Sequence, residues 1–403
     1  MCENIVMQKP ELLAPAGSPE KLRTAFLYGA DAVYAGGKDF SLRQYASNFT
    51  NDELSDGIRF AHSIGKKVYV TANIFPKNGD FAAAERFFAA LEEMGADAVL
   101  VTDPGFLKLA RRVAPSVKIH ISTQANTLNK YTAAFWAEQG ASRVVLAREL
   151  SLDDIAEISR FNPGLEIECF VHGAMCVSYS GRCLLSNYLT ERDANRGECV
   201  QACRWKYKLT EVNHSGAEAM EIEEDARGAY ILNSKDLDLL SELDKLSEAG
   251  VSSFKIEGRM KTVYYLATVV NAYRRVIDGS AAAADMEKEL TKINHRAYTK
   301  GYLYGERDDT LNYSEGQTAG EYEFIAVVLG YKDGVAEIEM RNRFRDGDVL
   351  EVLSPADSFL KTFAVHDMLN SDGERITDAS LVQQRLYLPV PFRLYKGDIL
   401  RRR

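Results

Sequence analysis

The chain has 403 residues, of which 46% are apolar and 27% charged, and its formal net charge is −9. The length indicates two or three domains or one large barrel with an appendage, and no low-complexity tract interrupts the globular composition. The acidic balance argues against a large basic surface for nucleic acid, although the C-terminal sequence FRLYKGDILRRR is a local basic patch, explained more simply as a solvated tail.

Short apolar runs alternate with longer amphipathic stretches over the first 260 residues. Eight such runs occur, at 11–17, 32–37, 67–75, 98–105, 118–126, 143–150, 165–173 and 252–259. Most stretches between them have helical spacing, and continuous apolar runs are typical of parallel strands buried on both faces. Eight βα units in this length predict a (β/α)8 TIM-type barrel. A doubly wound open sheet is the alternative, but it leaves the count of eight unexplained.

The segment between the seventh and eighth predicted strands is too long for one βα unit. It contains an insertion at about 174–235 that carries most of the cysteines of the chain. Long insertions after barrel strands usually build the active site at the carboxyl ends of the strands. We therefore expect a barrel domain over 1–315 whose site lies at that end, beneath the insertion.

The pattern changes to period two from about residue 319. The sequence EYEFIAVVLGYKDGVAEIEMRNRF predicts a hairpin that turns at Lys332, Asp333 and Gly334. Two further Gly-Asp turns, at 347–348 and 397–398, are typical of compact β structure. A small all-β barrel domain is therefore expected over 319–403.

Four of the six cysteines, Cys176, Cys183, Cys199 and Cys203, lie within one short run with the spacing C-x6-C-x15-C-x3-C. No apolar run reaches membrane-spanning length and the N-terminal sequence lacks an apolar signal core, so we expect a cytoplasmic protein without a membrane partner. A reducing compartment disfavours structural disulfides. The spacing lacks the paired knuckles of most zinc sites, and a [4Fe-4S] cluster accepts it more readily. Zinc and redox or structural thiols remain alternatives.

Polar residues gather where the predicted strands end, although strand interiors of a barrel are apolar. His172, Arg148, Glu257 and Arg259 are the candidate catalytic residues, because histidine titrates near neutral pH and buried charges need partners. Each has a structural alternative, such as a satisfied core histidine or an Arg148–Glu149 ion pair. The candidate substrate-binding residues are Tyr34, Arg43, Asn73, Gln124, Asn126, Lys235 and Lys255. Asn73 has a structural alternative as a helix cap, and the same holds for Ser122 and Asp103 at other strand ends.

The familiar catalytic signatures are missing. The sequence has no nucleophile elbow, HExxH zinc helix, Walker loop or convincing GxGxxG motif, and no serine, cysteine or threonine protease signature. The residues alone therefore point to cysteine-based metal or redox chemistry rather than to hydrolysis or nucleotide binding.

A series of motifs, in order along nearly the whole chain, resembles peptidase family U32, a collagenase-like family. The motifs are APAGSPE, GADAVYAGG, STQAN, RELSL, FVHGAMCVSYSGRCLLS, RGECVQACRW, NSKDL and SSFKIEGR. The run FVHGAMC…SGRC…GEC…CRW is the most specific of them. The chain is most similar to the branch of the family that hydroxylates tRNA.

The resemblance implies a reaction and a set of ligands. It implies prephenate-dependent conversion of the wobble uridine of tRNA to 5-hydroxyuridine, with Cys176, Cys183, Cys199 and Cys203 as ligands of a [4Fe-4S] cluster. Prephenate carries two carboxylates, which arginine and lysine side chains bind well. Alternatives within the family are a peptidase, a hydroxylase of a ribosomal RNA cytidine, and a scaffold that carries a cluster. The expected partners are tRNA, prephenate, and a protein partner or a second copy of the chain.

Overall fold

The computed structural model describes residues 9–38, 40–41, 48–205, 234–305 and 319–403. Within these ranges the chain forms two compact units. The first contains the described residues of 1–19, 31–260 and 295–318, and the second contains 20–30, 261–294 and 319–403.

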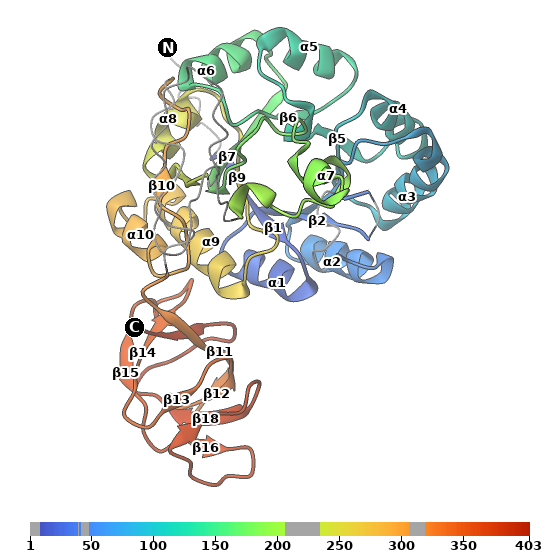
Figure 1. Cartoon of the computed structure of the whole chain (residues 1–403). Helices are drawn as coiled ribbons and strands as arrows, with labels where there is room; N and C mark the ends of the chain where they lie inside the picture. The colour runs from blue at the N-terminus through green and yellow to red at the C-terminus, as the bar shows by residue number, and fades with distance from the viewer. Residues whose placement is uncertain (1–8, 39, 42–47, 206–233, 306–318) are drawn as a thin grey trace, which may run out of the picture. The chain divides into compact units, whose positions relative to one another are not determined.

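The first unit is built on a closed ring of eight parallel strands (Figure 1). The strands are β1 (Glu11–Ala16), β2 (Ala32–Gly36), β3 (Lys67–Ala72), β4 (Ala98–Val101), β5 (Lys118–Ile121), β6 (Arg143–Val145), β7 (Glu166–Ala174) and β9 (Ser253–Ile256). Strand β9 pairs in parallel with both β7 and β1, which closes the ring. The predicted TIM-type barrel is therefore confirmed, and the open-sheet alternative is wrong.

Helices lie outside the ring in the first unit (Figure 1). They are α2 (Asn51–Ser63), α3 (Phe81–Met94), α4 (Pro104–Val113), α5 (Lys130–Glu138), α6 (Leu152–Phe161) and α8 (Leu243–Glu248). Local sequence sets their starts: Asp103 accepts from the Gly105 and Phe106 amides and Pro104 fills the first turn of α4, so the capping explanation of Asp103 is confirmed. The buried face of α2 follows the helical period, with Leu54, Ile58 and Ala61.

Two short strands extend the sheet beyond the ring. Strand β8 (Asp236–Asp238) pairs antiparallel with the end of β7, and β10 (Tyr298–Thr299) pairs with β8. The register places His172 of β7 opposite Asp238 of β8. This extension fixes the surroundings of His172, as described below.

The second unit contains an antiparallel sheet in the strand order β15-β14-β19-β11-β12-β18-β16. Its strands are β11 (Glu323–Lys332), β12 (Val335–Met340), β14 (Val349–Leu353), β15 (Thr362–Ala364), β16 (Leu369–Asn370), β18 (Arg385–Pro389) and β19 (Ile399–Arg402), and β13 (Phe344–Arg345) pairs separately with β17 (Asp378–Ala379). The predicted hairpin turn is confirmed, because Asp333 and Gly334 have φ values of 50° and 84°.

Three helices complete the second unit: α1 (Pro19–Leu27, from Glu20), α9 (Val263–Ile277) and α10 (Ala283–Leu290). The sheet encloses an aliphatic core that includes Ile338, Leu350 and Leu388, all without exposed surface. In the described part of the chain no helix is both long enough and apolar enough to cross a membrane.

Candidate active site

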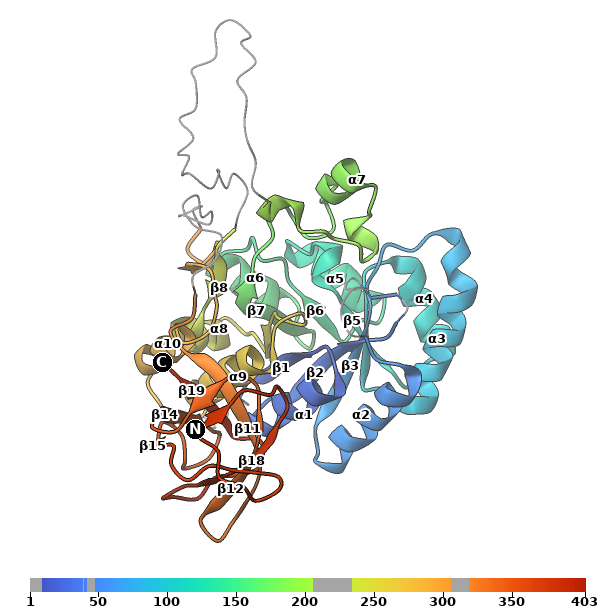
Figure 2. The same ribbon diagram turned by 60° about the horizontal axis from the view of Figure 1, so that its bottom comes forward.

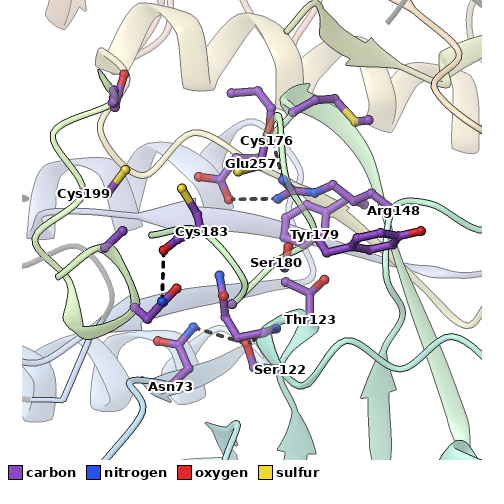
Figure 3. Close-up of a pocket in the computed structure, with 18 of the residues that line it drawn as sticks. Asn73, Ser122, Thr123, Arg148, Cys176, Tyr179, Ser180, Cys183, Cys199 and Glu257 are labelled. Carbon is purple, nitrogen blue, oxygen red and sulfur yellow. Dashed lines mark hydrogen bonds and ion pairs between the residues drawn. The ribbon is translucent and has the colours of Figure 1, made fainter. Parts of the chain in front are cut away.

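A pocket with about 1250 Å³ of empty space, including its open mouth, lies between the carboxyl ends of the barrel strands and the insertion after β7. The barrel contributes mostly polar side chains, among them Tyr34, Thr71, Asn73, Ser122, Thr123, Gln124, Arg148, Lys255, Glu257 and Arg259. The insertion contributes all four clustered cysteines together with Tyr179, Ser180, Asn195, Gln201 and Arg204. Figure 3 shows labelled residues of both groups around the pocket, with Cys176 beside Glu257 and Tyr179 beside Arg148.

The insertion is attached firmly to the barrel loops beneath it. It contains the helix α7 (Leu185–Thr190) and two helical turns, η3 (Ala194–Arg196) and η4 (Ala202–Arg204), and Figure 2 shows α7 beyond the strand ends. Arg196 Nη1 donates to the Phe75 carbonyl at 2.8 Å and pairs with Asp80 at 2.8 Å. Gly181 has φ of +75° and a side chain there would come within 2.7 Å of the Gln124 carbonyl. The loops after β3 and β5 therefore position the insertion over the pocket.

The four cysteines are free thiols that line this one pocket. Burial raises the pKa of Cys203, the charge of Arg204 lowers it, and the thiols of Cys176, Cys199 and Cys183 raise it further, so each of these three lies within electrostatic range of Cys203. Among the residues that the structure describes, no group of three or more His, Cys, Asp or Glu side chains has an arrangement that could hold a metal ion as it stands.

The cysteines nevertheless fit an iron–sulfur cluster in kind, number and place. A [4Fe-4S] cluster takes four thiolates, and four cysteines line the pocket. Three of the cysteines are partly exposed and Cys176 is exposed. A positively charged iron centre would also offset the mutual repulsion of four thiolates.

Arg148 lines the pocket from the loop after β6. Its guanidinium carbon is 4.0 Å from the centre of the Phe170 ring, and Nη1 donates to the Ala174 carbonyl at 3.2 Å. Its Nη2 is 3.9 Å from Glu257 Oε2, which also accepts a hydrogen bond from the Tyr34 hydroxyl at 3.3 Å (Figure 3). Arg148 thus pairs with Glu257 across two strand ends, whereas the structural alternative for Arg148 was an ion pair with Glu149.

Lys255 lies at the floor of the pocket on β9. Its Nζ donates to Glu168 Oε1 at 2.6 Å and lies 4.6 Å from the centre of the Tyr34 ring. Burial opposes ionisation of Glu168, but Lys255 and Arg143 together hold the pKa of that carboxyl below its usual range. An ammonium group is therefore fixed at the base of the pocket.

Arg259 supplies a third cation. It is 4% exposed, and its Nη1 donates to Ser41 Oγ at 2.7 Å and to Thr71 Oγ1 at 3.2 Å. The space for the guanidinium exists because residue 36 is glycine, since a side chain at Gly36 would overlap Arg259 Nη1 and approach Ser41 Oγ to 2.6 Å. The hydroxyl groups of Ser41 and Thr71 therefore help to orient this guanidinium.

Asn73, Ser122 and Gln124 form the remaining polar wall. Asn73 Nδ2 donates to Ser122 Oγ at 3.3 Å, and Ser122 also accepts weakly from the Gln124 amide. Ser122 is thus both a cap of a short helical turn and a pocket residue. Amide and hydroxyl groups of this kind can hydrogen-bond the edge of a heterocyclic base.

His172, Asn126 and Lys235 do not line the pocket. His172 is 1% exposed, and its Nδ1 is 3.9 Å from Asp238 Oδ1. Burial raises the pKa of Asp238, but the hydrogen bond and charge of His172 lower it overall, as expected for a structural pair. Asn126 ends the turn after β5 with φ of 56°, and Arg43 lies outside the described residues. The functional roles of these four residues stay predictions.

Sequence reasoning missed Glu168, Thr71 as a partner of Arg259, and the pocket residues Tyr179 and Arg204. Glu168 lies in the middle of an otherwise apolar stretch of β7, between Ile167 and Cys169, which was the available signal for a buried charge. Tyr179 and Arg204 lie in the insertion. Its sequence has no helical or strand periodicity, so the sequence does not indicate which of its side chains face the pocket.

Comparison with known proteins agrees with this architecture. The family model "Peptidase family U32" matches residues 17–313, and the model "Peptidase family U32 C-terminal domain" matches 320–401. The chain is 40% identical to tRNA hydroxylation protein P1 of Bacillus subtilis (99% of this chain, 96% of that protein) and 40% identical to tRNA hydroxylation protein P of Escherichia coli (96% and 94%). A 23S rRNA 5-hydroxycytidine synthase of Escherichia coli is 40% identical over 85% of this chain and 52% of that protein. With a barrel, a cysteine-bearing insertion and a C-terminal β unit all accounted for by these matches, the chain belongs to peptidase family U32.

Proposed function

We propose that this protein is an RNA-modifying enzyme that takes part in converting the wobble uridine of tRNA to 5-hydroxyuridine. The relatives that share about 40% of its sequence over nearly its full length are named for tRNA hydroxylation. The observation that carries the proposal is that four cysteines and three cations of the barrel, Arg148, Lys255 and Arg259, line one pocket at the carboxyl ends of the strands.

The cations support prephenate as the co-substrate. Prephenate carries two carboxylates, and arginine binds a carboxylate through two parallel hydrogen bonds. Arg148 and Arg259 both line the pocket, so each can bind one of the two carboxylates. Lys255, which is paired with Glu168, adds positive charge at the same site.

The four thiols support an iron–sulfur cofactor. In this proposal Cys176, Cys183, Cys199 and Cys203 hold a [4Fe-4S] cluster, with zinc as the alternative occupant. A bound cluster supplies electron transfer beside the pocket. The role of the chain is to hold the co-substrate and the uridine base on the opposite wall, formed by Asn73, Ser122 and Gln124.

A peptidase is the weaker candidate. Hydrolytic sites use a nucleophile with a base, or a metal-bound water with an open coordination position. Among the described residues that line the pocket there is no histidine, and Glu257 is already engaged by Tyr34 and Arg148. Only the family name favours hydrolysis.

The test is mass spectrometry of tRNA nucleosides from a strain that lacks this protein. We expect loss of 5-hydroxyuridine and its derivatives, recovery with the wild-type chain, and no recovery with Cys176→Ala or Cys199→Ala. Cys169→Ala is the matched control, because Cys169 is buried in β7 and does not line the pocket.

Three outcomes separate the alternatives. Unchanged tRNA with a missing ribosomal 5-hydroxycytidine would move the substrate to rRNA. Product formed only when a second protein is added to the purified chain would favour the scaffold. Full recovery with both cysteine variants would remove the cluster from the reaction.

A further inference from the structure

The insertion that carries the cysteines exposes large apolar side chains at high density. Tyr188 is 85% exposed, Tyr179 is 49% and Trp205 is 42%, and Leu184 at 69% and Leu189 at 42% lie between them. Apolar groups gathered in one short segment of a soluble surface mark an interaction site. The segment therefore has the composition of an interaction surface.

The exposed rings border the mouth of the pocket. Tyr179 itself lines the pocket while half of its surface remains open. Tyr188 belongs to α7, whose residues Leu185 and Ser186 line the pocket, and Trp205 directly follows Arg204, which also lines it. Figure 3 shows Tyr179 on the same side as Arg148, and Figure 2 shows α7 beyond the strand ends. Whatever stacks on these rings lies next to the reacting group.

The chemistry of the segment fits unpaired nucleotides better than a protein. All three rings are Tyr or Trp, and exposed Arg182 follows Tyr179 by three residues, while Arg204 precedes Trp205. Aromatic rings alternating with arginine are the usual platform for single-stranded bases and their phosphates. Bases in a duplex already stack on one another, so only loop nucleotides present free faces to such rings.

The overall charge of the chain favours the same conclusion. With a net charge of −9, the protein as a whole repels RNA, so affinity must come from local contacts. Stacking supplies such contacts without a large basic surface. Extraction of a target base into the pocket would also leave its neighbours unstacked, and exposed rings at the pocket mouth can replace the lost stacking.

We propose that Tyr179, Tyr188 and Trp205 form a stacking surface for the unpaired nucleotides that flank the target base in an RNA loop. The inference rests on the proposed function and extends it, because it names the surface that selects a loop over a duplex. It requires no covalent step.

The experiment measures binding of an RNA stem–loop with an unpaired, uridine-containing loop, and of the fully paired duplex, to the full chain by fluorescence anisotropy at fixed salt. We expect Tyr188→Ala and Trp205→Ala each to weaken stem–loop binding roughly tenfold or more. Tyr188→Phe keeps the ring and should bind as the wild type does. Tyr131→Ala, which removes a 68% exposed ring from α5, is the matched control and should also bind normally.

Duplex binding should change in none of these variants, and their melting temperatures should equal that of the wild type because the rings are exposed. Wild-type affinity for the stem–loop in both Tyr188→Ala and Trp205→Ala would overturn the inference, as would equal losses for stem–loop and duplex. Loss of a copurifying protein without any change in RNA affinity would overturn it in favour of a protein-binding surface.

The two proposals fail in different ways. If the wild-type chain restores 5-hydroxyuridine in the deletion strain but the ring variants bind RNA normally, the stacking surface is wrong and the proposed function stands. If the ring variants lose stem–loop binding but the deletion strain has unchanged tRNA nucleosides, the surface stands and the proposed reaction is wrong.

Discussion

Each unit of the molecule contains a largely buried network of ion pairs, and the network in the second unit balances its own charges. Arg401 on β19 has no exposed surface, and its guanidinium contacts Glu289 of α10 at 2.6 Å and Glu351 of β14 at 2.8 Å. Lys292 pairs with both carboxylates, at 2.7 and 2.8 Å. Two cations meet two anions, so this network satisfies its own charges and holds helix and sheet together.

The network in the barrel opens at one end. Glu168 is also without exposed surface, and it contacts Arg143 at 2.9 Å and Lys255 at 2.6 Å. Arg143 continues to Glu11 at 2.7 Å, away from the pocket, whereas Lys255 lines the pocket. In the first unit the ion pair of Glu168 and Lys255 therefore holds a cation in the pocket. In the second unit the ion pairs of Arg401 only stabilise the fold.

The largest loss of stability is expected from removing one cation of the Arg401 network. Arg401→Met leaves Glu289 and Glu351 buried with a single cation between them, and breaking a buried pair costs about 3–5 kcal/mol. Chemical denaturation should show this loss, while RNA modification per folded molecule stays at the wild-type level. The double variant Arg401→Met/Glu289→Gln restores the charge balance and should recover much of the stability. A stable Arg401→Met protein would contradict this arrangement.

The second prediction concerns pH and the same unit. Burial raises the pKa of Tyr264 on α9 to about 12, with Arg401 acting in the opposite direction. A raised pKa in the folded state gives stability that is present below about pH 10 and is lost as the pH rises towards 12. Tyr264→Phe should therefore lose less stability than the wild type over that interval, by about 2–3 kcal/mol. Parallel denaturation curves from pH 9 to 12 would contradict it.

The barrel was predictable from the sequence because its strands are buried on both faces. The run LEIECFVHG became β7, and seven similar runs became the other strands of the ring, since no amphipathic alternation was needed to recognise them. The cysteine spacing likewise pointed to one cluster of thiols, and all four line one pocket. Both signals are local in the chain, which is why they could be read.

Long-range pairing could not be read in the same way. His172 was assigned to the rim from its place near a strand end, but β8, a three-residue strand, pairs with that end and sets Asp238 against it. Glu168 was visible as a charge in a strand, yet its partners come from other strands far along the chain. The grouping of α9 and α10 with the C-terminal strands also depends on contacts that no local pattern contains.

The third prediction tests whether the open network positions a pocket cation. Glu168→Gln removes the charged partner of Lys255, while Arg143 keeps Glu11, so the expected loss of stability is only about 1–3 kcal/mol. The affinity for an anionic co-substrate should fall because the ammonium group is no longer fixed. If Glu168 acts through Lys255, Lys255→Met should lower the affinity by a similar factor, and the double variant should fall no further. Additive losses measured as KM for prephenate would show that the two residues act separately.

The smallest effect is expected from moving a pocket cation without changing any charge. Gly36→Ala places a methyl group where Arg259 Nη1 lies and 2.6 Å from Ser41 Oγ, so the guanidinium must shift. We expect about a tenfold loss of co-substrate affinity, about 1.4 kcal/mol, with little change in unfolding. Gly79→Ala is the matched control, because a side chain there meets nothing within 4 Å. Equal KM values for the two alanine variants would mean that the pocket tolerates a displaced Arg259. Lys255 would then be the cation on which the comparison between the two ion-pair networks depends.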